Sequence, residues 1–424
     1  MSAAANPAQD PGELIAQMAV RARAAQRHLA LLDPARKSAG LRAAAAQLRS
    51  AEAQILAENA LDIAAGEAAG LSEAMLDRLR LDSARLEGMA GALEQIAALP
   101  DPVGQVIDSS TPPSGLELSR VRVPIGVIGI IYESRPNVTA DAAALCLASG
   151  NAVLLRGGSE AVHSNRAIHA ALSAGLAEAG VPVDAVQLVP VQDRAAVGAM
   201  LAAAGQIDLI VPRGGKSLVA RVQADARVPV LAHLDGINHT YVHSAADPGK
   251  AKAIALNAKL RRTGVCGAME TLLLDVQFGG SQAVVAALIE AGCELRGDAR
   301  ARALDPRVLP ASATDWDTEY LGAVLSVAVV DGLDAALAHI ALHSSGHTDA
   351  VVSEDHATCE RFLTQVDSAI VMANASTQFA DGGEFGLGAE IGIATGRLHA
   401  RGPVALEGLT TYKWLVRGSG QVRP

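Results

Sequence analysis

The sequence predicts an α/β protein built from two doubly wound domains with parallel sheets. Short apolar runs alternate with longer amphipathic segments from residue 127 onward, and the connections between them are short and marked by glycine or proline. Alternating strands and helices of this kind form parallel sheets with crossover helices. The pattern starts again near residue 238, and 424 residues exceed what one hydrophobic core usually supports. We therefore expect two or three domains.

The first hundred residues are rich in alanine and have helical spacing. Apolar residues recur one turn apart, as in Leu14 and Met18, until Pro100-Asp101-Pro102 ends this section. This spacing predicts three or four amphipathic helices. Residues 116–123 alternate apolar and charged side chains, which predicts an exposed strand.

Strands and helices then follow one another in both domains. The mostly apolar run 127–132 is typical of a strand buried on both faces, and further strands of the first domain are expected at 151–156, 185–190 and 207–211. Its helices are expected at 140–149, 164–179, 194–204 and 217–226. The second domain is expected to contain strands 271–275, 324–330 and 350–353 and helices 250–257, 282–291 and 333–340. Residues 410–417 resemble one more strand with no obvious place in either sheet. Ligands of such sheets bind at the carboxyl ends of the strands.

Composition argues against several classes of protein. A formal net charge of −10 and only ten aromatic residues oppose binding to nucleic acid. No apolar run approaches the roughly 20 residues of a membrane-spanning helix, and the first residues do not resemble a signal peptide, so a cytoplasmic location is expected. The four cysteines are widely spaced without a CxxC pair, which argues against a zinc site and a disulfide framework.

Two glycine-containing turns are candidate phosphate sites. Residues 156–160 and 212–217 each follow a predicted strand and open a predicted helix, where backbone N–H groups carry partial positive charge. Arg213 and Lys216 add full charges. Ordinary loops remain the alternative, because glycine is a standard turn residue. The second turn is not a Walker motif, since Ile210 stands at the required earlier glycine position.

Cys266 is the candidate nucleophile. It lies between Gly264 and Gly267 and follows two arginines, and nearby cations lower the pKa of a thiol. The glycines expose the sulfur and leave backbone N–H groups open to a developing oxyanion. A buried structural cysteine is the alternative. A Cys–His hydrolase using His233, His343 or His347 is disfavoured, because no local protease signature surrounds the cysteine.

Long segments of the chain resemble the γ-glutamyl phosphate reductases, a family of the aldehyde dehydrogenase superfamily. The resemblance extends from about residue 15 to 417 and is carried by residues 132–141, 149–161, 261–271, 343–350 and 379–393. It implies an aldehyde dehydrogenase-like fold. It also implies the NADPH-dependent reduction of L-glutamyl 5-phosphate to L-glutamate 5-semialdehyde with release of phosphate, which is the second step of proline biosynthesis from glutamate.

The resemblance also assigns roles to individual residues. Cys266 matches the nucleophile, which would form a thioester that hydride from NADPH reduces, and Asn137 matches the side-chain donor to the oxyanion. No glutamate in residues 231–236 matches the base of the hydrolytic members, whose water attack would waste the activated acid. The positions that match the cofactor site are Arg156, Gly157, Ser159, Glu160, Arg213, Gly214, Gly215, Glu384 and Phe385.

Substrate contacts are the least specific part of the resemblance. Arg135, Arg262 and Asp349 are candidates by charge and motif, but solvated surface residues would look the same. Glu160 would repel a 2′-phosphate, so a preference for NADPH needs Arg156 or another cation. Two departures from the family pattern, Gly267 for Asn and Asn238 for Cys, put no catalytic role in doubt.

The expected domains follow the superfamily. Residues 1–112 and 126–237, with about 374–397, should bind NADPH, residues 238–373 should form the catalytic domain, and residues 113–125 and 398–424 should form an oligomerisation flap. We expect a homo-oligomer, and contact with glutamate 5-kinase because the acyl phosphate is labile. The alternatives are another acyl-phosphate or acyl-CoA reductase of the superfamily and a non-catalytic subunit that docks onto the kinase.

Overall fold

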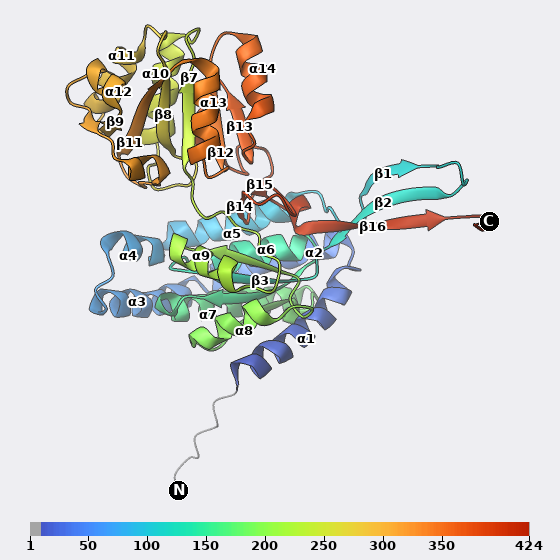
Figure 1. Cartoon of the computed structure of the whole chain (residues 1–424). Coiled ribbons are helices and arrows are strands. Elements are labelled where there is room, and N and C mark those ends of the chain that lie inside the picture. Colours follow the sequence, from blue (N-terminus) through green and yellow to red (C-terminus); the bar gives the residue numbers. More distant parts are fainter. Residues whose placement is uncertain (1–9, 424) are drawn as a thin grey trace. The chain divides into compact units, whose positions relative to one another are not determined.

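The computed structural model describes residues 10–423 and divides into two compact units (Figure 1). The first unit contains the chain through Ala232 together with Leu387–Gly392 and the segment from Val404 onward, and the second contains His233–Gly386 and Ile393–Pro403. Residues 1–9 and 424, which belong to the expected first domain and flap, lie outside the described residues. Residues 374–386 were expected in the first domain but belong to the second unit, where Gln378 donates hydrogen bonds to the carbonyls of Ala258 and Arg262.

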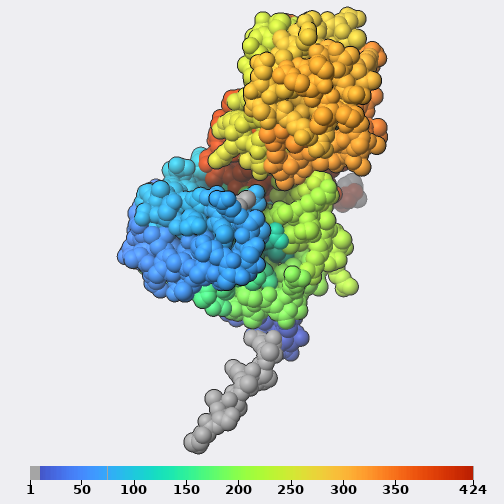
Figure 2. All heavy atoms as spheres, turned by 90° about the vertical axis from the view of Figure 1, so that its left-hand side faces the viewer, coloured from blue at the N-terminus to red at the C-terminus, as the bar shows by residue number. Residues whose placement is uncertain are grey.

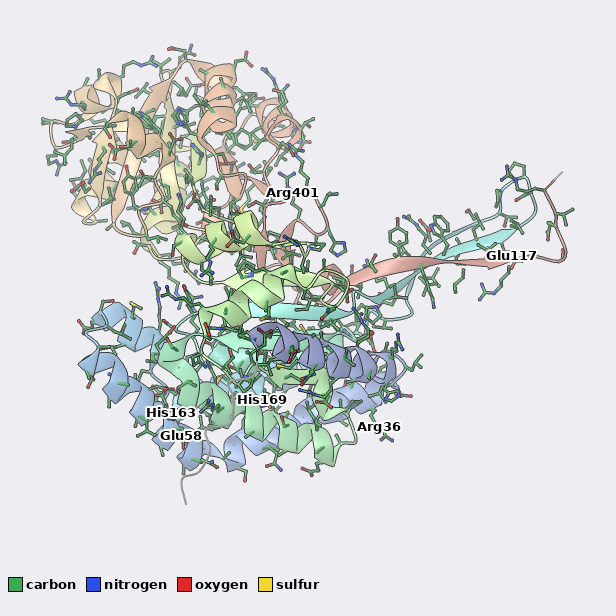
Figure 3. All side chains as sticks on the ribbon, turned by 60° about the horizontal axis from the view of Figure 1, so that its bottom comes forward. Arg36, Glu58, Glu117, His163, His169 and Arg401 are labelled. Carbon is green, nitrogen blue, oxygen red and sulfur yellow. The ribbon has the colours of Figure 1, made fainter. Side chains whose placement is uncertain are left out.

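From residue 10 onward, five helices precede the first strand, whereas the sequence predicted three or four. They are α1 (Pro11–Leu29), α2 (Pro34–Ser50), α3 (Glu52–Ala68), α4 (Glu73–Leu79) and α5 (Ser83–Ala98). Several begin at aspartates, since Asp10, Asp33 and Asp82 each accept a hydrogen bond from a backbone N–H of the first turn. In Figure 3, Glu58 of α3 and His163 lie side by side, and the His163 Nδ1 is 3.2 Å from the Glu58 carboxylate.

The sheet of the first unit is parallel, as predicted. Its order is β5-β4-β3-β6, with β3 (Val127–Tyr132), β4 (Ala152–Gly157), β5 (Val186–Leu188) and β6 (Leu209–Arg213). Its helices are α6 (Asn137–Ala148), α7 (Val162–Glu178), α8 (Arg194–Ala202) and α9 (Lys216–Asp225). Every residue of β3 is buried, which confirms the prediction that this run is covered on both faces, and every residue of β4 is buried as well.

The second unit contains a seven-stranded parallel sheet of order β10-β9-β11-β8-β7-β12-β13. The strands are β7 (Asn238–Val242), β8 (Met269–Asp275), β9 (Glu294–Gly297), β10 (Leu309–Pro310), β11 (Val324–Val330), β12 (Thr348–Val352) and β13 (Ile370–Ala373). The helices are α10 (Pro248–Leu260), α11 (Ser281–Glu290), α12 (Ala299–Leu304), α13 (Gly332–His343) and α14 (His356–Gln365). The sequence predicted β8, β11 and β12. It did not predict β7, whose buried residues are largely polar.

A three-stranded antiparallel sheet extends from the first unit (Figure 1). It has the order β1-β2-β16, with β1 (Val106–Ser110), β2 (Glu117–Pro124) and β16 (Thr410–Arg417), and Glu117 lies near its far end (Figure 3). The strand at 410–417 thus finds its place along β2. The expected flap omitted β1, and residues 402–404 (β15, Gly402–Val404) pair instead with β14 (Gly392–Ala394). Among the described residues, none of the helices is both long and apolar enough to cross a membrane.

Candidate active site

A cleft of about 760 Å³ lies at the carboxyl ends of β3 and β4 in the first unit. In the space-filling view, the N-terminal helices (blue) and the segment around residues 190–225 (green) border the hollow (Figure 2). Three of the predicted cofactor residues line it, namely Arg156, Ser159 and Glu160. The location of the cleft fits the expectation that ligands of a parallel sheet bind at the carboxyl ends of its strands.

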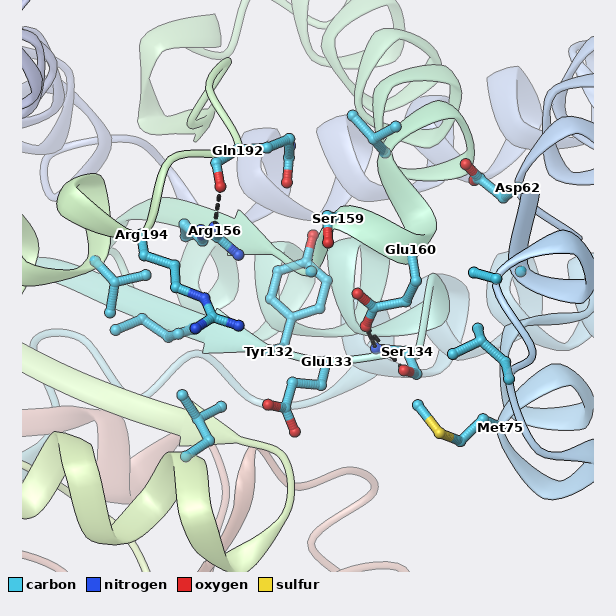
Figure 4. Close-up of a pocket in the computed structure, with 18 of the residues that line it drawn as sticks. Asp62, Met75, Tyr132, Glu133, Ser134, Arg156, Ser159, Glu160, Gln192 and Arg194 are labelled. Atoms are coloured by element: carbon cyan, nitrogen blue, oxygen red, sulfur yellow. Dashed lines mark hydrogen bonds between the residues drawn. The ribbon is translucent and has the colours of Figure 1, made fainter.

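Arg156 brings a buried cation to the cleft. Its side chain donates hydrogen bonds to the carbonyls of Gly157 and Gln192, each at 2.9 Å, while its Nε has no partner among the described residues (Figure 4). Burial lowers the pKa of Arg156, and the nearby Glu160 acts in the opposite direction. Arg194, which the sequence analysis did not single out, points toward the same space (Figure 4). Two guanidinium groups therefore face a site that also contains a carboxylate.

The Glu160 carboxylate is held by the loop that follows β3. It accepts hydrogen bonds from the backbone N–H of Ser134, at 2.5 Å, and from the Ser134 hydroxyl, at 2.8 Å (Figure 4). Ser134 has a φ of 40°, a conformation that few residues other than glycine adopt. A Cβ on Gly158 would lie 2.3 Å from this carboxylate, so a side chain there would force the Glu160 carboxylate to move.

The second glycine turn adjoins the cleft through Glu133. The backbone N–H of Gly215, at the start of α9, donates to the Glu133 carboxylate at 3.0 Å, and a Cβ on Gly214 would lie 2.4 Å from the same oxygen. This helix start therefore already engages a negative group, as helix N-termini favour. Arg213 lies instead against Gly392, where a Cβ would come within 2.8 Å of its Nη1.

A second cleft of the first unit, of about 480 Å³, contains Arg135 and Asn137. Arg78, Arg80 and Arg85 also line it, together with Asp77 and Asp141. The Asn137 amide donates a hydrogen bond of 2.8 Å to Asp141, one turn later in α6. Burial raises the pKa of Asp141 to about 6, although the Asn137 hydrogen bond and the charge of Arg213 lower it.

Cys266 lies beside two histidines in the second unit. One ligand-type atom from each of His233, Cys266 and His347 lies within 4.8 Å of the other two, and we call these residues the thiol cluster. Cys266 is partly exposed, whereas the other three cysteines are buried and burial raises the pKa of each thiol, that of Cys293 to about 12. The structure thus singles out Cys266 as the most accessible of the four thiols.

The cluster is assembled at the amino ends of three adjacent strands. His233, Cys266 and His347 precede β7, β8 and β12, which are neighbours in the sheet. Sequence analysis named these histidines without assigning them a role in this chemistry. The information that was missing was the strand order, which places residues 33 to 114 positions apart next to one another.

Hydrogen bonds fix the orientation of both imidazoles. The Nδ1 of His233 lies 2.7 Å from the Ile393 carbonyl, an acceptor, so Nδ1 carries a proton, and in the neutral ring the lone pair is on Nε2. His347 is fully buried, with Nδ1 2.9 Å from the Thr348 hydroxyl and Nε2 without a partner among residues 10–423. Burial, with a smaller contribution from His233, lowers the pKa of His347 to about 3, so this ring is neutral at physiological pH.

Cys266 lies in the loop between α10 and β8, residues 261–268, which we call the thiol loop, and Asn238 and Gly236 contact its backbone. The buried Asn238 amide donates to the carbonyls of Cys266, at 2.6 Å, and Ala268, at 2.8 Å, and accepts from the Thr348 N–H. A Cβ on Gly236 would lie 2.2 Å from the Cys266 carbonyl oxygen. Asn238, noted in the sequence only as a departure from a family pattern, therefore joins the thiol loop to β12.

The remaining candidates of the second unit differ in accessibility. Asp349 is fully buried in β12 and accepts hydrogen bonds from His239, Ser344 and Ser368. Arg262 and Glu384 are exposed. Phe385 lies in the turn after Ala380, and its relative solvent-accessible surface is 45%.

This combination of a nucleotide-sized cleft in one α/β unit and an accessible thiol in the other is typical of dehydrogenases that work through cysteine. The chain belongs to the aldehyde dehydrogenase family, whose model matches residues 4–305. It is 73% identical over 412 residues to the gamma-glutamyl phosphate reductase of Novosphingobium aromaticivorans, an alignment that covers 97% of each chain.

Solved structures agree with this assignment. The crystal structure of gamma-glutamyl phosphate reductase from Thermotoga maritima matches with a TM-score of 0.95 and 42% identity, covering 97% of this chain and 100% of that one. An engineered glycolyl-CoA reductase with bound NADP+ matches with a TM-score of 0.67 and 16% identity, covering 95% of this chain and 96% of that one. The second likeness concerns the fold alone. The family match and the first structure together confirm the predicted aldehyde dehydrogenase-like architecture.

Proposed function

We propose that this chain reduces L-glutamyl 5-phosphate to L-glutamate 5-semialdehyde, with release of phosphate, in proline biosynthesis. The observation that carries the proposal is the 73% identity to a gamma-glutamyl phosphate reductase over nearly the whole length of both chains. The accessible thiol of Cys266 supports it, because an acyl phosphate is reduced most directly through a covalent acyl-enzyme.

In the proposed mechanism, Cys266 is the nucleophile. Its thiolate attacks the acyl carbon, the C–S bond forms, the C–O bond to phosphate breaks, and phosphate leaves with that bonding pair. His233 is suited to accept the thiol proton, because its Nδ1–H is committed to the Ile393 carbonyl and its lone pair is on Nε2. Asn137 is proposed as the side-chain donor to the oxyanion, with Asp141 orienting its amide.

A nicotinamide cofactor is expected throughout this family, and NADPH is our proposal for this chain. The first-unit cleft fits a phosphorylated nucleotide, since Arg156 retains a buried Nε without a partner among residues 10–423 and Arg194 points into the same space. When bound, NADPH supplies the hydride that reduces the acyl group. The residues proposed to hold it are Arg156, Gly157, Ser159, Glu160, Arg194, Arg213, Gly214, Gly215, Glu384 and Phe385.

Arg135 and Arg262 are the side chains that we propose to contact the substrate. Arg135 shares a cleft with Asn137 and three further arginines, which outnumber the two aspartates that also line it, and this excess of positive charge suits an anionic substrate. Arg262 is exposed and four residues before the nucleophile. The buried, fully hydrogen-bonded carboxylate of Asp349 fits a supporting role better than direct contact with the substrate.

Self-association is proposed through the three-stranded sheet. Apolar side chains remain exposed on it, among them Val106, Trp414 and Val416, and such surfaces are typical of protein contacts. A dimer or tetramer in analytical ultracentrifugation is the expected result. Contact with glutamate 5-kinase and a cytoplasmic location stay predictions.

The experiment follows the reaction in reverse, because the acyl phosphate is unstable. Glutamate 5-semialdehyde, NADP+ and phosphate are mixed, and NADPH absorbance is recorded for the native chain, Cys266→Ala and the matched control Cys359→Ala. We expect phosphate-dependent formation of NADPH that is lost only in Cys266→Ala. NADPH formation without a need for phosphate would indicate a hydrolytic dehydrogenase, and a requirement for coenzyme A would indicate an acyl-CoA reductase.

A further inference from the structure

The thiol cluster has the composition of a metal site. A thiolate and two imidazoles are the ligands that zinc prefers, and three protein ligands with one open position are typical of accessible zinc sites. The three ligand atoms all lie within 4.8 Å of one another. In tetrahedral zinc sites with bonds of 2.0–2.3 Å, ligand atoms are about 3.3–3.7 Å apart, so shifts of less than about 1 Å would bring these atoms into place.

The surroundings of the cluster favour coordination. The Ile393 carbonyl fixes His233 as the tautomer whose lone pair is on Nε2, and backbone acceptors of this kind are the usual outer partners of zinc-bound histidine. His347 is fully buried, and its Nε2 has no hydrogen-bond partner among residues 10–423. A buried polar atom without a partner is costly, and a bound cation would satisfy it.

We propose that His233, Cys266 and His347 form a zinc-binding site that reversibly blocks the nucleophile. Zinc binds the thiolate, the thiol proton passes to solvent, and no electron is transferred. While the metal is bound, the sulfur lone pair is not available to attack an acyl carbon or to be alkylated. Widely spaced cysteines without a CxxC pair argued against a zinc site, but here the ligands come from three neighbouring strand starts rather than from one motif.

The binding part of this inference is independent of the proposed function, whereas the inhibition part rests on it. The first measurement is therefore a titration of the full, reduced and chelator-treated chain with Zn²⁺ in competition with a chromophoric chelator. We expect one equivalent bound per chain. Co²⁺ should give a near-ultraviolet thiolate-to-metal charge-transfer band, and Mg²⁺, which prefers oxygen ligands, should not compete.

The variants assign the ligands. Cys266→Ala should abolish the charge-transfer band and weaken zinc binding more than about 100-fold, and His233→Gln should weaken it at least about 10-fold. His233 is only partly buried, so this variant serves even if His347→Gln fails to fold. Cys359→Ala and His343→Gln are matched controls from the same unit, and both should bind zinc like the native chain.

A second readout does not depend on the reductase assay. Zinc should slow alkylation of Cys266 by iodoacetamide, and EDTA should restore the original rate. Native zinc affinity in both Cys266→Ala and His233→Gln, or a cobalt complex without a charge-transfer band, would overturn the inference. Zinc binding in a chain without reductase activity would count against the proposed function alone.

Discussion

The two parallel sheets carry their candidate functional residues at opposite edges. In the first unit, these residues follow β3, β4 and β6, at the carboxyl ends of the strands, where helix starts favour an anionic ligand. In the second unit, the thiol cluster precedes β7, β8 and β12, at the amino ends. The thiol of Cys266 lies in a loop rather than at a helix start. It needs accessible sulfur, adjacent imidazoles and a rigid backbone, which the loops entering the strands provide here.

The two edges also differ in how they are held. Apart from buried residues such as Arg156, the cleft of the first unit is lined by charged side chains that are at least partly exposed, whereas the thiol loop is hydrogen-bonded to the buried Asn238. Buried polar networks are costly to break, and surface charges are screened. Substitutions at the amino edge of the second sheet should therefore have larger effects than substitutions at the carboxyl edge of the first.

The largest effect is expected for Gly236→Ala. Its Cβ would lie 2.2 Å from the Cys266 carbonyl oxygen, so the thiol loop must shift, and displacements of about 1 Å at a reacting group can cost about 100-fold in rate. We expect kcat/KM of the reverse reaction to fall at least about 100-fold. The control is Gly264→Ala. Gly264 lies in the thiol loop itself, its Cβ would have nothing within 4 Å, and this variant should retain activity. Equal activity of the two variants would show that the loop is not rigid.

Asp349→Asn should mainly reduce stability. Burial acts to raise the pKa of Asp349, but hydrogen bonds from His239, Ser368 and Ser344 outweigh it and hold the pKa below its usual value. The carboxylate therefore stabilises the fold above the unfolded pKa of about 3.9, and this contribution is lost as the pH falls through the folded pKa. We expect a loss of about 2–4 kcal/mol in the free energy of unfolding at pH 7, measured by denaturant titration.

The control for this prediction is Asp355→Asn, at the exposed start of α14, where asparagine caps a helix equally well. It should leave the free energy of unfolding nearly unchanged. A raised KM in Asp349→Asn with native stability would instead support direct contact between Asp349 and the substrate.

Sequence reasoning predicted the first unit better than the second for a physical reason. Strands β3 and β4 are continuous apolar runs, and the glycine turns after β4 and β6 are local signals that a short window contains. Strand β7 reads Asn-His-Thr-Tyr-Val and gives no apolar signal, although every residue in it is buried. The thiol cluster depends on the neighbourhood of β8, β7 and β12, and strand order is not a property of any local segment.

Single residues illustrate the same limit. Cys266 could be singled out because its flanking glycines and arginines lie within a few positions of it. Asn238 could not be recognised as a support, because its partners Ala268 and Thr348 lie 30 and 110 residues away. Arg194 begins a predicted helix, and its position beside Arg156 depends on the pairing of β4 with β5.

At the carboxyl edge of the first sheet, Arg194→Ala should change cofactor preference rather than stability. Its guanidinium points into the cleft beside Arg156, where it would interact with an added 2′-phosphate (Figure 4). A partly solvated charge pair at this range is worth about 1 kcal/mol, so we expect the preference for NADPH over NADH to fall about 5- to 10-fold. Arg166→Ala, an exposed arginine of α7, is the control. An unchanged ratio of kcat/KM for the two cofactors would assign the preference to Arg156 or another cation.

The smallest effect is expected for Asp141→Asn, which tests whether charge at the carboxyl edge is tolerated. Burial raises the pKa of Asp141 to about 6, so the fold is more stable when this group is protonated, and that stability is lost as the pH rises from about 4 through 6. Asparagine removes the charge while its carbonyl still accepts from Asn137. The variant should gain about 1 kcal/mol at pH 7 after allowance for solvent, and its stability should vary less between pH 4 and 6. Asp141→Ala removes the acceptor too, so activity retained in Asp141→Asn but reduced in Asp141→Ala would show that the hydrogen bond to Asn137, rather than the charge, serves the reaction.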